Sequence, residues 1–236
     1  MIHVRNLNAG YRKLQILFDV SASFDRERIN VIVGPNGSGK STLLKSIFGL
    51  TTIYSGSITL DGVELVGKAP HEIARIGVAY LPQTENIFEN LTIEENLKMA
   101  GYVLDKSELK ERIEEVAELF PVIRKYWKRR ARLLSGGERQ MIAMAMALLR
   151  KPKVMLFDEP TGGLAPKIAN EVLSKIVELR DTLDMTIILV EQNARKALEI
   201  GDKAYLLVGG RLIFEGGCHE FLNHPRFSTL YFGISS

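Results

Sequence analysis

The segment from Gly34 to Thr42, GPNGSGKST, constrains the fold more than any other part of the chain. It follows the β-branched run RINVIVG and precedes KSTLLKSIFGL, whose apolar residues recur at helical spacing. A turn of this pattern between a strand and a helix is typical of a phosphate-binding loop, because its backbone N–H groups and the helix amino terminus surround phosphate oxygens. A plain glycine-rich turn is the alternative, which this context disfavours.

The loop also supplies candidate ligands for a nucleotide and its metal ion. Lys40 can reach the β- and γ-phosphates, and the hydroxyl of Ser41 can ligate Mg²⁺. The candidate ATP-binding residues of this loop are Gly34, Pro35, Asn36, Gly37, Ser38, Gly39, Lys40, Ser41 and Thr42.

Further strand-like runs alternate with helix-like runs. The runs GVAYLPQ, KVMLFDEP and TIILV have the apolar, β-branched character of buried strands, and ERQMIAMAMALLR and KIANEVLSKIVELRD separate them with helical spacing. This alternation predicts a parallel sheet with helices on both faces. The runs ILFDVSASF and ITLDGVEL predict short antiparallel strands that form a small β-layer beside it.

The chain from Thr92 to about Leu133 is predicted to be wholly helical. Thr92 and Glu95 have capping-box spacing, and KSELKERIEEVAELF is amphipathic. Its apolar face comprises Leu109, Ile113, Val116, Ala117 and Phe120. We expect one domain over 1–236, with a core of 1–90 and 134–236 and a helical lobe of 91–133 that continues into the next helix.

Two acidic residues end the strand-like run VMLFDEP. Asp158 can hold the shell of a magnesium ion, and Glu159 can orient or deprotonate an attacking water. Read alone, the pair fits solvated acids at a strand end equally well. The phosphate-binding loop earlier in the chain favours the catalytic interpretation.

The segment LLSGGERQ predicts a second anion-binding helix start. Ser135 and Glu138 have capping-box spacing, and the two glycines between them expose backbone N–H groups. One bound triphosphate does not need two such sites on the same molecule. We therefore expect this helix start to serve the nucleotide of a neighbouring subunit.

These motifs, in this order and spacing, resemble those of ATP-binding-cassette (ABC) ATPases over almost the whole chain. The resemblance implies an α/β P-loop NTPase core with a mixed, mainly parallel sheet, a small antiparallel β-layer and an inserted α-helical lobe. It also implies two subunits that sandwich two ATPs head to tail. Each ATP then contacts the opposite subunit's signature, which here comprises Leu134, Ser135, Gly136, Gly137 and Glu138.

The resemblance assigns further roles around ATP. Tyr11 matches the aromatic that stacks on adenine, and Gln83 matches the Q-loop glutamine that contacts Mg²⁺ or water. The expected magnesium residues are Ser41, Gln83 and Asp158, the last through water, and the expected catalytic residues are Glu159, Lys40, Gln192 and Gln83. A tyrosine of the β-layer and an ordinary loop glutamine are the plain alternatives for Tyr11 and Gln83.

Two positions depart from the family pattern. Ala165 replaces the usual aspartate of the D-loop, and Gln192 replaces the H-loop histidine that contacts the γ-phosphate. A glutamine amide can donate a hydrogen bond to a phosphate oxygen, but it cannot carry charge as histidine can. Our hypothesis is that Gln192 is a neutral donor at the γ-phosphate; a loop residue beside a slow or degenerate site is the alternative.

GLAP together with LVEQN narrows the resemblance to LivF-type ATPase subunits of branched-chain amino acid importers and to the similar urea-importer subunit. The glutamine of LPQ, where many members of the amino acid branch have glutamate, leaves the substrate open. The expected partners are a second ATPase subunit, identical or different, transmembrane permease subunits and, indirectly, a solute-binding protein. The expected location is peripheral, on the cytoplasmic face of the cell membrane.

Composition separates this hypothesis from other classes of protein. A formal net charge of +3 does not favour nucleic acid as a partner, and the basic stretch YWKRRAR fits a solvated helical face. The single cysteine, Cys218, suits a reducing compartment. With no apolar run long enough to span a bilayer, we expect a soluble chain. A non-transport ABC ATPase acting on nucleic acid and a P-loop kinase are the less favoured alternatives.

Overall fold

Strand β3 (Ile29–Val33) leads into the phosphate-binding loop and lies inside a six-stranded sheet of order β10-β9-β3-β8-β7-β6. The computed structural model describes residues 1–84 and 86–223. Strands β3, β6, β7, β8 and β9 are parallel, and among the described strands of this sheet only β10 pairs in the antiparallel sense, with β9. The other bounds are β6 Val78–Leu81, β7 Val154–Asp158, β8 Thr186–Val190, β9 Lys203–Val208 and β10 Arg211–Gly217. The sheet is therefore mixed and mainly parallel, which confirms the predicted fold class.

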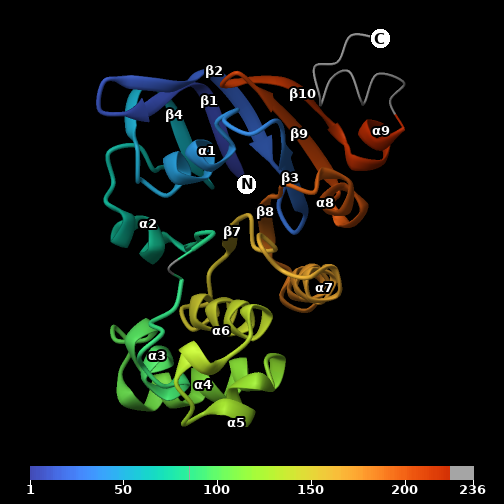
Figure 1. Ribbon diagram of the computed structural model, residues 1–236. Coiled ribbons are helices and arrows are strands. Elements are labelled where there is room, and N and C mark those ends of the chain that lie inside the picture. Colours follow the sequence, from blue (N-terminus) through green and yellow to red (C-terminus); the bar gives the residue numbers. More distant parts are fainter. Residues whose placement is uncertain (85, 224–236) are drawn as a thin grey trace.

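A second, four-stranded antiparallel sheet forms the predicted β-layer. Its order is β2-β1-β4-β5, and its bounds are β1 Ile2–Tyr11, β2 Leu14–Phe24, β4 Thr52–Leu60 and β5 Val63–Glu64. Helix α1 (Lys40–Ile47) lies between this layer and the larger sheet (Figure 1). Its buried residues Leu43, Leu44 and Ile47 share one apolar core with strands of both sheets. This core fixes the helix that begins at the phosphate-binding loop.

Helices cover the opposite face of the larger sheet. Along β8, Ile187 and Leu189 join the core beneath those helices, whereas Ile188 and Val190 join the core around α1. Both faces are buried, which explains why this strand is a continuous apolar run. The remaining helices are α2 Pro70–Ile76, α6 Gly136–Leu148, α7 Pro166–Leu183, α8 Ala194–Ile200 and α9 Cys218–Leu222. Strands β9 and β10 and helices α2, α8 and α9 were not predicted from the sequence.

A helical lobe is inserted between β6 and β7 and occupies the lower part of Figure 1. It comprises α3 Ile93–Ala100, α4 Lys106–Leu119, α5 Val122–Tyr126 and a 3₁₀ turn at Ala131–Leu133, with turns between them. The Thr92 hydroxyl accepts the N–H of Glu95 as the capping box predicts, and an isolated bridge between Thr92 and Arg130 joins the two ends of the insertion. The exact division into 1–90, 91–133 and 134–236 stays a prediction, and residues 224–236 lie outside the described residues.

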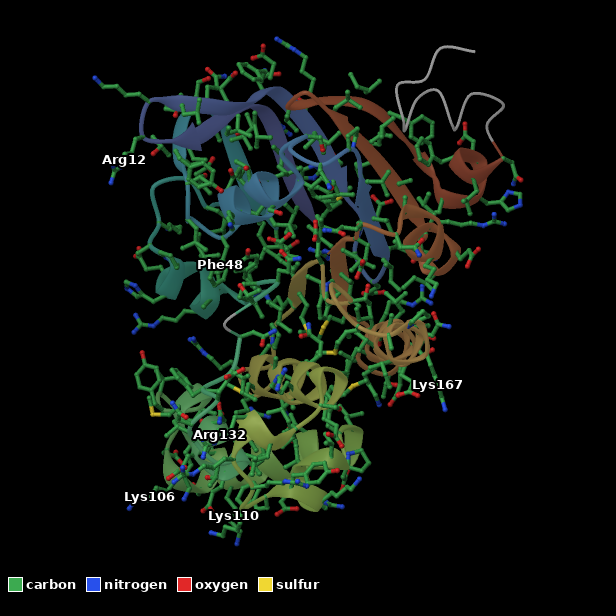
Figure 2. All side chains as sticks on the ribbon, in the orientation of Figure 1. Arg12, Phe48, Lys106, Lys110, Arg132 and Lys167 are labelled. Carbon is green, nitrogen blue, oxygen red and sulfur yellow. The ribbon has the colours of Figure 1, made fainter. Side chains whose placement is uncertain are left out.

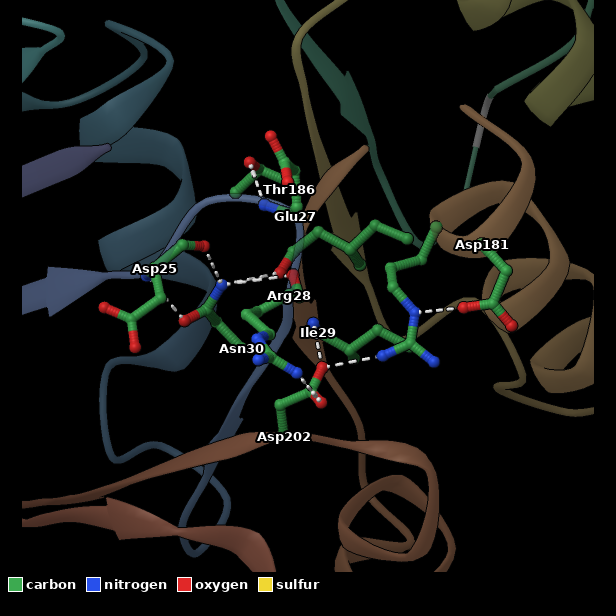
Figure 3. Close-up of polar contacts among 10 residues, drawn as sticks. Asp25, Glu27, Arg28, Ile29, Asn30, Asp181, Thr186 and Asp202 are labelled. Atoms are coloured by element: carbon green, nitrogen blue, oxygen red, sulfur yellow. Dashed lines mark hydrogen bonds and ion pairs between the residues drawn. The ribbon is translucent and has the colours of Figure 1, made fainter. Parts of the chain in front are cut away.

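Side chains pin the amino ends of the central strands to one another (Figure 3). Asp202, just before β9, accepts the backbone N–H of Ile29 at 2.8 Å and pairs with Arg180 at 2.8 Å. The amide of Asn30, which is fully buried, donates to the carbonyl oxygens of Asp25, Arg28 and Ile187. The Thr186 hydroxyl accepts the N–H of Glu27 at 3.0 Å. We call Asp25, Arg28, Asn30, Arg180, Thr186 and Asp202 the amino-end cluster.

Basic side chains are distributed over separate parts of the surface. Figure 2 shows Arg12 on the β-layer, Lys106 and Lys110 on the helical lobe and Lys167 at the start of α7, each pointing outward. None of the helices within residues 1–84 and 86–223 is both long enough and apolar enough to cross a bilayer.

Candidate nucleotide-binding site

The phosphate-binding loop connects the carboxyl end of β3 to the first turn of α1. Gly37 and Gly39 have φ of 77° and 100°, in the left-handed region that glycine adopts readily. The ammonium of Lys40 donates to the carbonyl oxygens of Gly34 at 2.9 Å and Pro35 at 3.0 Å, which closes the loop on itself. Burial lowers the pKa of Lys40, while the nearby carboxylates of Glu159 and Asp158 oppose that shift. The loop therefore holds a buried cation beside two acids.

One hydroxyl of the loop has no acceptor within the described residues. Ser38 is 3% exposed, and its Oγ makes no hydrogen bond there. Buried polar atoms without a partner are rare in folded proteins. A donor for which the loop supplies no acceptor fits a site built for phosphate oxygens.

Asp158 ends β7 beside the start of α1. Its Oδ1 accepts the Ser41 hydroxyl at 2.7 Å, and its Oδ2 accepts the Tyr80 hydroxyl at 3.0 Å. A hydroxyl and a carboxylate are the hard oxygen ligands that Mg²⁺ prefers, so Ser41 and Asp158 fit the predicted metal site. Tyr80 was not predicted from the sequence; burial and the nearby Asp158 raise its pKa, so it stays a donor.

Glu159 follows in a left-handed conformation, with φ of 52°. Its Oε2 accepts the amide of Gln83 at 2.9 Å and the amide of Gln192 at 2.7 Å. The two glutamines extend from the ends of β6 and β8, so three strand ends meet at one carboxylate. Gln83, the third predicted magnesium residue, thus contacts Glu159 rather than the Ser41–Asp158 pair.

Several of these residues line a cavity of about 360 Å³ at the carboxyl ends of the strands, and Asp158 is not among its lining residues. Its lining comprises Ile16, Asn36, Gly37, Gly39, Lys40, Ser41, Thr42, Gln83, Glu159 and Gln192. The cavity thus joins most of the predicted loop and catalytic residues, and adds Ile16, which the sequence analysis missed. Tyr11 is not among the lining residues; it ends β1 with 40% of its surface exposed.

The signature residues lie at the start of α6, outside that cavity. Ser135 caps the helix: its hydroxyl accepts the Glu138 N–H at 3.3 Å, and the Glu138 carboxylate accepts the Ser135 N–H at 2.9 Å. This arrangement confirms the predicted capping box. Leu134 is buried and Ser135 is exposed. The cap therefore presents the helix amino terminus at the surface.

The two signature glycines also satisfy a packing requirement that the motif did not reveal. A Cβ added to Gly137 would lie 2.2 Å from Cγ2 of Ile168, and one added to Gly136 would lie 2.7 Å from Cδ2 of Leu164. Both neighbours belong to the turn after β7 and the first turn of α7. Ala165, in place of the family's aspartate, precedes α7 without a side-chain cap. The glycines therefore let α7 approach α6.

Comparison with known proteins agrees with this geometry. The sequence profile described as ABC transporter matches residues 17–162. The probable branched-chain amino acid transport ATP-binding protein LivF of Archaeoglobus fulgidus is 55% identical over 234 residues, which cover 99% of each chain. The high-affinity branched-chain amino acid transport ATP-binding protein BraG of Pseudomonas aeruginosa is 40% identical over 99% of this chain and 100% of its own. The solved ADP conformation of MJ1267, an ATP-binding cassette of an ABC transporter, aligns with a TM-score of 0.87 at 25% identity over 99% of each chain. The chain belongs to the ABC transporter family of ATP-binding proteins.

Proposed function

We propose that this chain hydrolyses ATP to power the import of branched-chain amino acids. The observation that carries the proposal is the cavity where Lys40, Ser41, Glu159 and Gln192 meet at the strand ends. The substrate follows from similarity to the LivF and BraG proteins, whose names specify branched-chain amino acid transport.

Positioning and charge stabilisation supply most of the catalysis in this proposal. Lys40 and the loop amides hold the phosphates. Ser41 and Asp158, the latter through water, would hold Mg²⁺, and Gln83 would join them by turning away from Glu159; the ion neutralises charge on the phosphate oxygens when bound. Glu159 aligns or deprotonates the attacking water, and Gln192 is a neutral donor toward the γ-phosphate.

We further propose that each ATP site is completed by a second ATPase subunit, identical or different. Ser135 and Gly137 lie outside the phosphate-loop cavity, as expected for groups that serve the neighbour's nucleotide. Tyr11 stacks on the adenine in this arrangement. Permease subunits anchor the pair at the cytoplasmic face of the membrane, and a solute-binding protein delivers the substrate to them.

The solution mass of Glu159→Gln tests this shared site. The variant should bind MgATP without rapid turnover, so the full chain should form an ATP-dependent dimer if it pairs with itself. A monomer that retains ATP would contradict self-pairing. Adding the second ATPase subunit of the same transporter should then give the heteromeric pair; no pairing with either partner would contradict the shared site.

Reconstitution with the permease subunits and solute-binding protein of the same transporter tests the substrate. Leucine-loaded binding protein should stimulate ATP turnover in proteoliposomes and drive leucine uptake. Stimulation by urea or by another small solute instead would support the alternative importer. The formal net charge of only +3 favours transport over nucleic-acid binding, and a salt-sensitive gel shift with DNA would contradict that preference.

A further inference from the structure

Glu191 is a buried acid that the proposed reaction does not use. It follows β8 directly, it is 2% exposed, and its Oε1 accepts the backbone N–H of Thr161 at 3.0 Å. Burial raises the pKa of its carboxyl, whereas bonds from Thr161 and from the Gln192 backbone lower it. Burying a carboxyl group costs free energy unless its oxygens accept hydrogen bonds. The bond from Thr161 meets this requirement and also ties Glu191 to the segment that follows Glu159.

That bond closes a ring of backbone and hydrogen bonds that includes the carboxylate of Glu159. Thr161 lies two residues after Glu159, and Gln192 lies one residue after Glu191. The Gln192 amide donates to Oε2 of Glu159 at 2.7 Å. The ring therefore consists of two short backbone segments, 159–161 and 191–192, joined by two side-chain hydrogen bonds. The Thr161–Glu191 bond thus restrains the backbone that carries Glu159.

The backbone of Glu159 needs such support. Its φ of 52° is unusual for a residue with a side chain, and such conformations persist where the surroundings hold them. The N–H of Glu159 donates to the Val190 carbonyl oxygen at 2.9 Å, which extends the β7–β8 pairing by one residue. The next tie between the two strand ends is the bond from Thr161 to Glu191.

The same turn, residues 159–165, also touches the signature helix. We call it the post-β7 turn. The N–H of Leu164 donates to the Thr161 carbonyl oxygen at 3.1 Å, and the Leu164 side chain lies against Gly136. The post-β7 turn is thus held by Glu191 on one side and packed against α6 on the other.

We propose that Glu191 is a positioning residue that fixes the post-β7 turn by accepting the Thr161 N–H, and so orients Glu159 toward the bound nucleotide. This inference rests on the proposed ATPase function and on the role of Glu159 in it. The length of the side chain and its acceptor oxygen perform the task, whereas its negative charge is not required.

Replacing Glu191 with aspartate and with glutamine separates length from charge. Glu191→Gln keeps an acceptor oxygen at the same reach, so kcat of the full chain should stay within about threefold of the wild type. Glu191→Asp keeps the charge but is one methylene shorter, so kcat should fall at least about tenfold while KM for ATP changes less than about twofold. ATP turnover over a range of MgATP concentrations gives both constants, and thermal unfolding confirms that each variant folds.

Two outcomes would overturn the proposal: wild-type turnover by Glu191→Asp, or a loss of turnover in Glu191→Gln as large as that in Glu191→Asp, which would show that an uncharged acceptor oxygen at the same reach is not sufficient. Thr186→Val is a matched control, because Thr186 is a buried polar residue at the other end of β8. It should lower thermal stability and leave kcat within about twofold. Glu159→Gln, assayed alongside, tests the ATPase function separately: if it hydrolyses ATP as fast as the wild type, the role of Glu159 fails and this inference fails with it.

Discussion

The two ends of the parallel strands both carry polar and acidic residues, but they differ in how many of the hydrogen-bonding groups there have partners within the protein. At the amino ends, Asn30 and Asp202 bond to backbone groups of neighbouring segments, and the buried amide of Asn30 donates to three carbonyl oxygens (Figure 3). At the carboxyl ends, Ser38 has no partner among the described residues, and Glu159 adopts a left-handed conformation beside a cavity. The amino ends therefore hold the fold together, whereas the carboxyl ends keep polar groups available for a ligand.

The largest expected effect is the loss of nucleotide binding in Lys40→Met. The ammonium is the buried cation of the carboxyl-end cavity, and charge-assisted hydrogen bonds contribute about 1.5–3 kcal/mol each. MgATP affinity, measured by calorimetry, should fall at least about a hundredfold. Lys45→Met, in the last turn of the same helix, is the matched control and should bind normally. Wild-type MgATP affinity in Lys40→Met would contradict the assignment of ligand binding to the carboxyl ends of the strands.

Asn30→Ala should have the reverse effect. It removes a donor from three carbonyl oxygens, of which that of Ile187 is in a buried hydrogen bond, so the free energy of unfolding should fall by about 1–3 kcal/mol, while the folded protein binds MgATP normally. Chemical denaturation measures the loss. Arg28→Ala, which removes an exposed ion pair of the same cluster, should cost less than about 1 kcal/mol. A change in MgATP affinity without a change in stability would contradict the structural role of the amino-end cluster.

Gly137→Ala tests a residue that both lets α7 pack against α6 and, in our proposal, contacts the neighbouring subunit's nucleotide. The added Cβ would lie 2.2 Å from Ile168, so overpacking should cost about 1–3 kcal/mol of stability. Ile168→Ala should recover much of that loss in the double variant, because it removes the conflicting atoms. A fully stable Gly137→Ala variant would show that α7 moves aside, and would limit the glycine requirement to nucleotide contact.

Gln192→Ala should have a moderate effect on chemistry. A neutral hydrogen bond contributes about 0.5–1.5 kcal/mol, so kcat should fall about three- to tenfold with little change in MgATP affinity. Gln192→His, which restores a ring donor, should recover activity. Turnover by Gln192→Ala equal to that of the wild type would rule out the donor role.

The smallest expected effect is a pH dependence of stability. Because burial raises the pKa of Glu191 in the folded chain, its contribution to stability is present below the ordinary glutamate pKa and is lost as pH rises through the folded value. Glu191→Gln removes this titration. Its unfolding temperature relative to the wild type should therefore increase from acid to neutral pH, and a constant difference would contradict the raised pKa.

Local patterns predicted the parts of the site that depend on neighbours in sequence. The phosphate-binding loop, the acids Asp158 and Glu159 at the end of β7 and the capping boxes at Thr92 and Ser135 all lie where the sequence placed them. Such signals involve residues a few positions apart, so no knowledge of the tertiary fold is needed.

The parts that were missed depend on contacts between distant segments. Tyr80 meets Asp158 across neighbouring strands, Ile168 packs on Gly137 from another helix, and Glu191 binds Thr161 from the end of β8. The final strands were missed for a related reason: β10 has no fully buried residue and pairs with β9 through an irregular register. Tertiary contacts decide such elements, and one sequence does not reveal them.

The central claim is that the carboxyl-end cavity binds MgATP and that Glu159 promotes its hydrolysis there. The direct test measures bound nucleotide and ATP turnover in the wild type and in Glu159→Gln, at equal protein concentration. We expect the variant to retain MgATP and to lose at least about a hundredfold in turnover, as the removal of a general base should produce. Equal turnover in the two proteins, with ATP bound to both, would contradict the account.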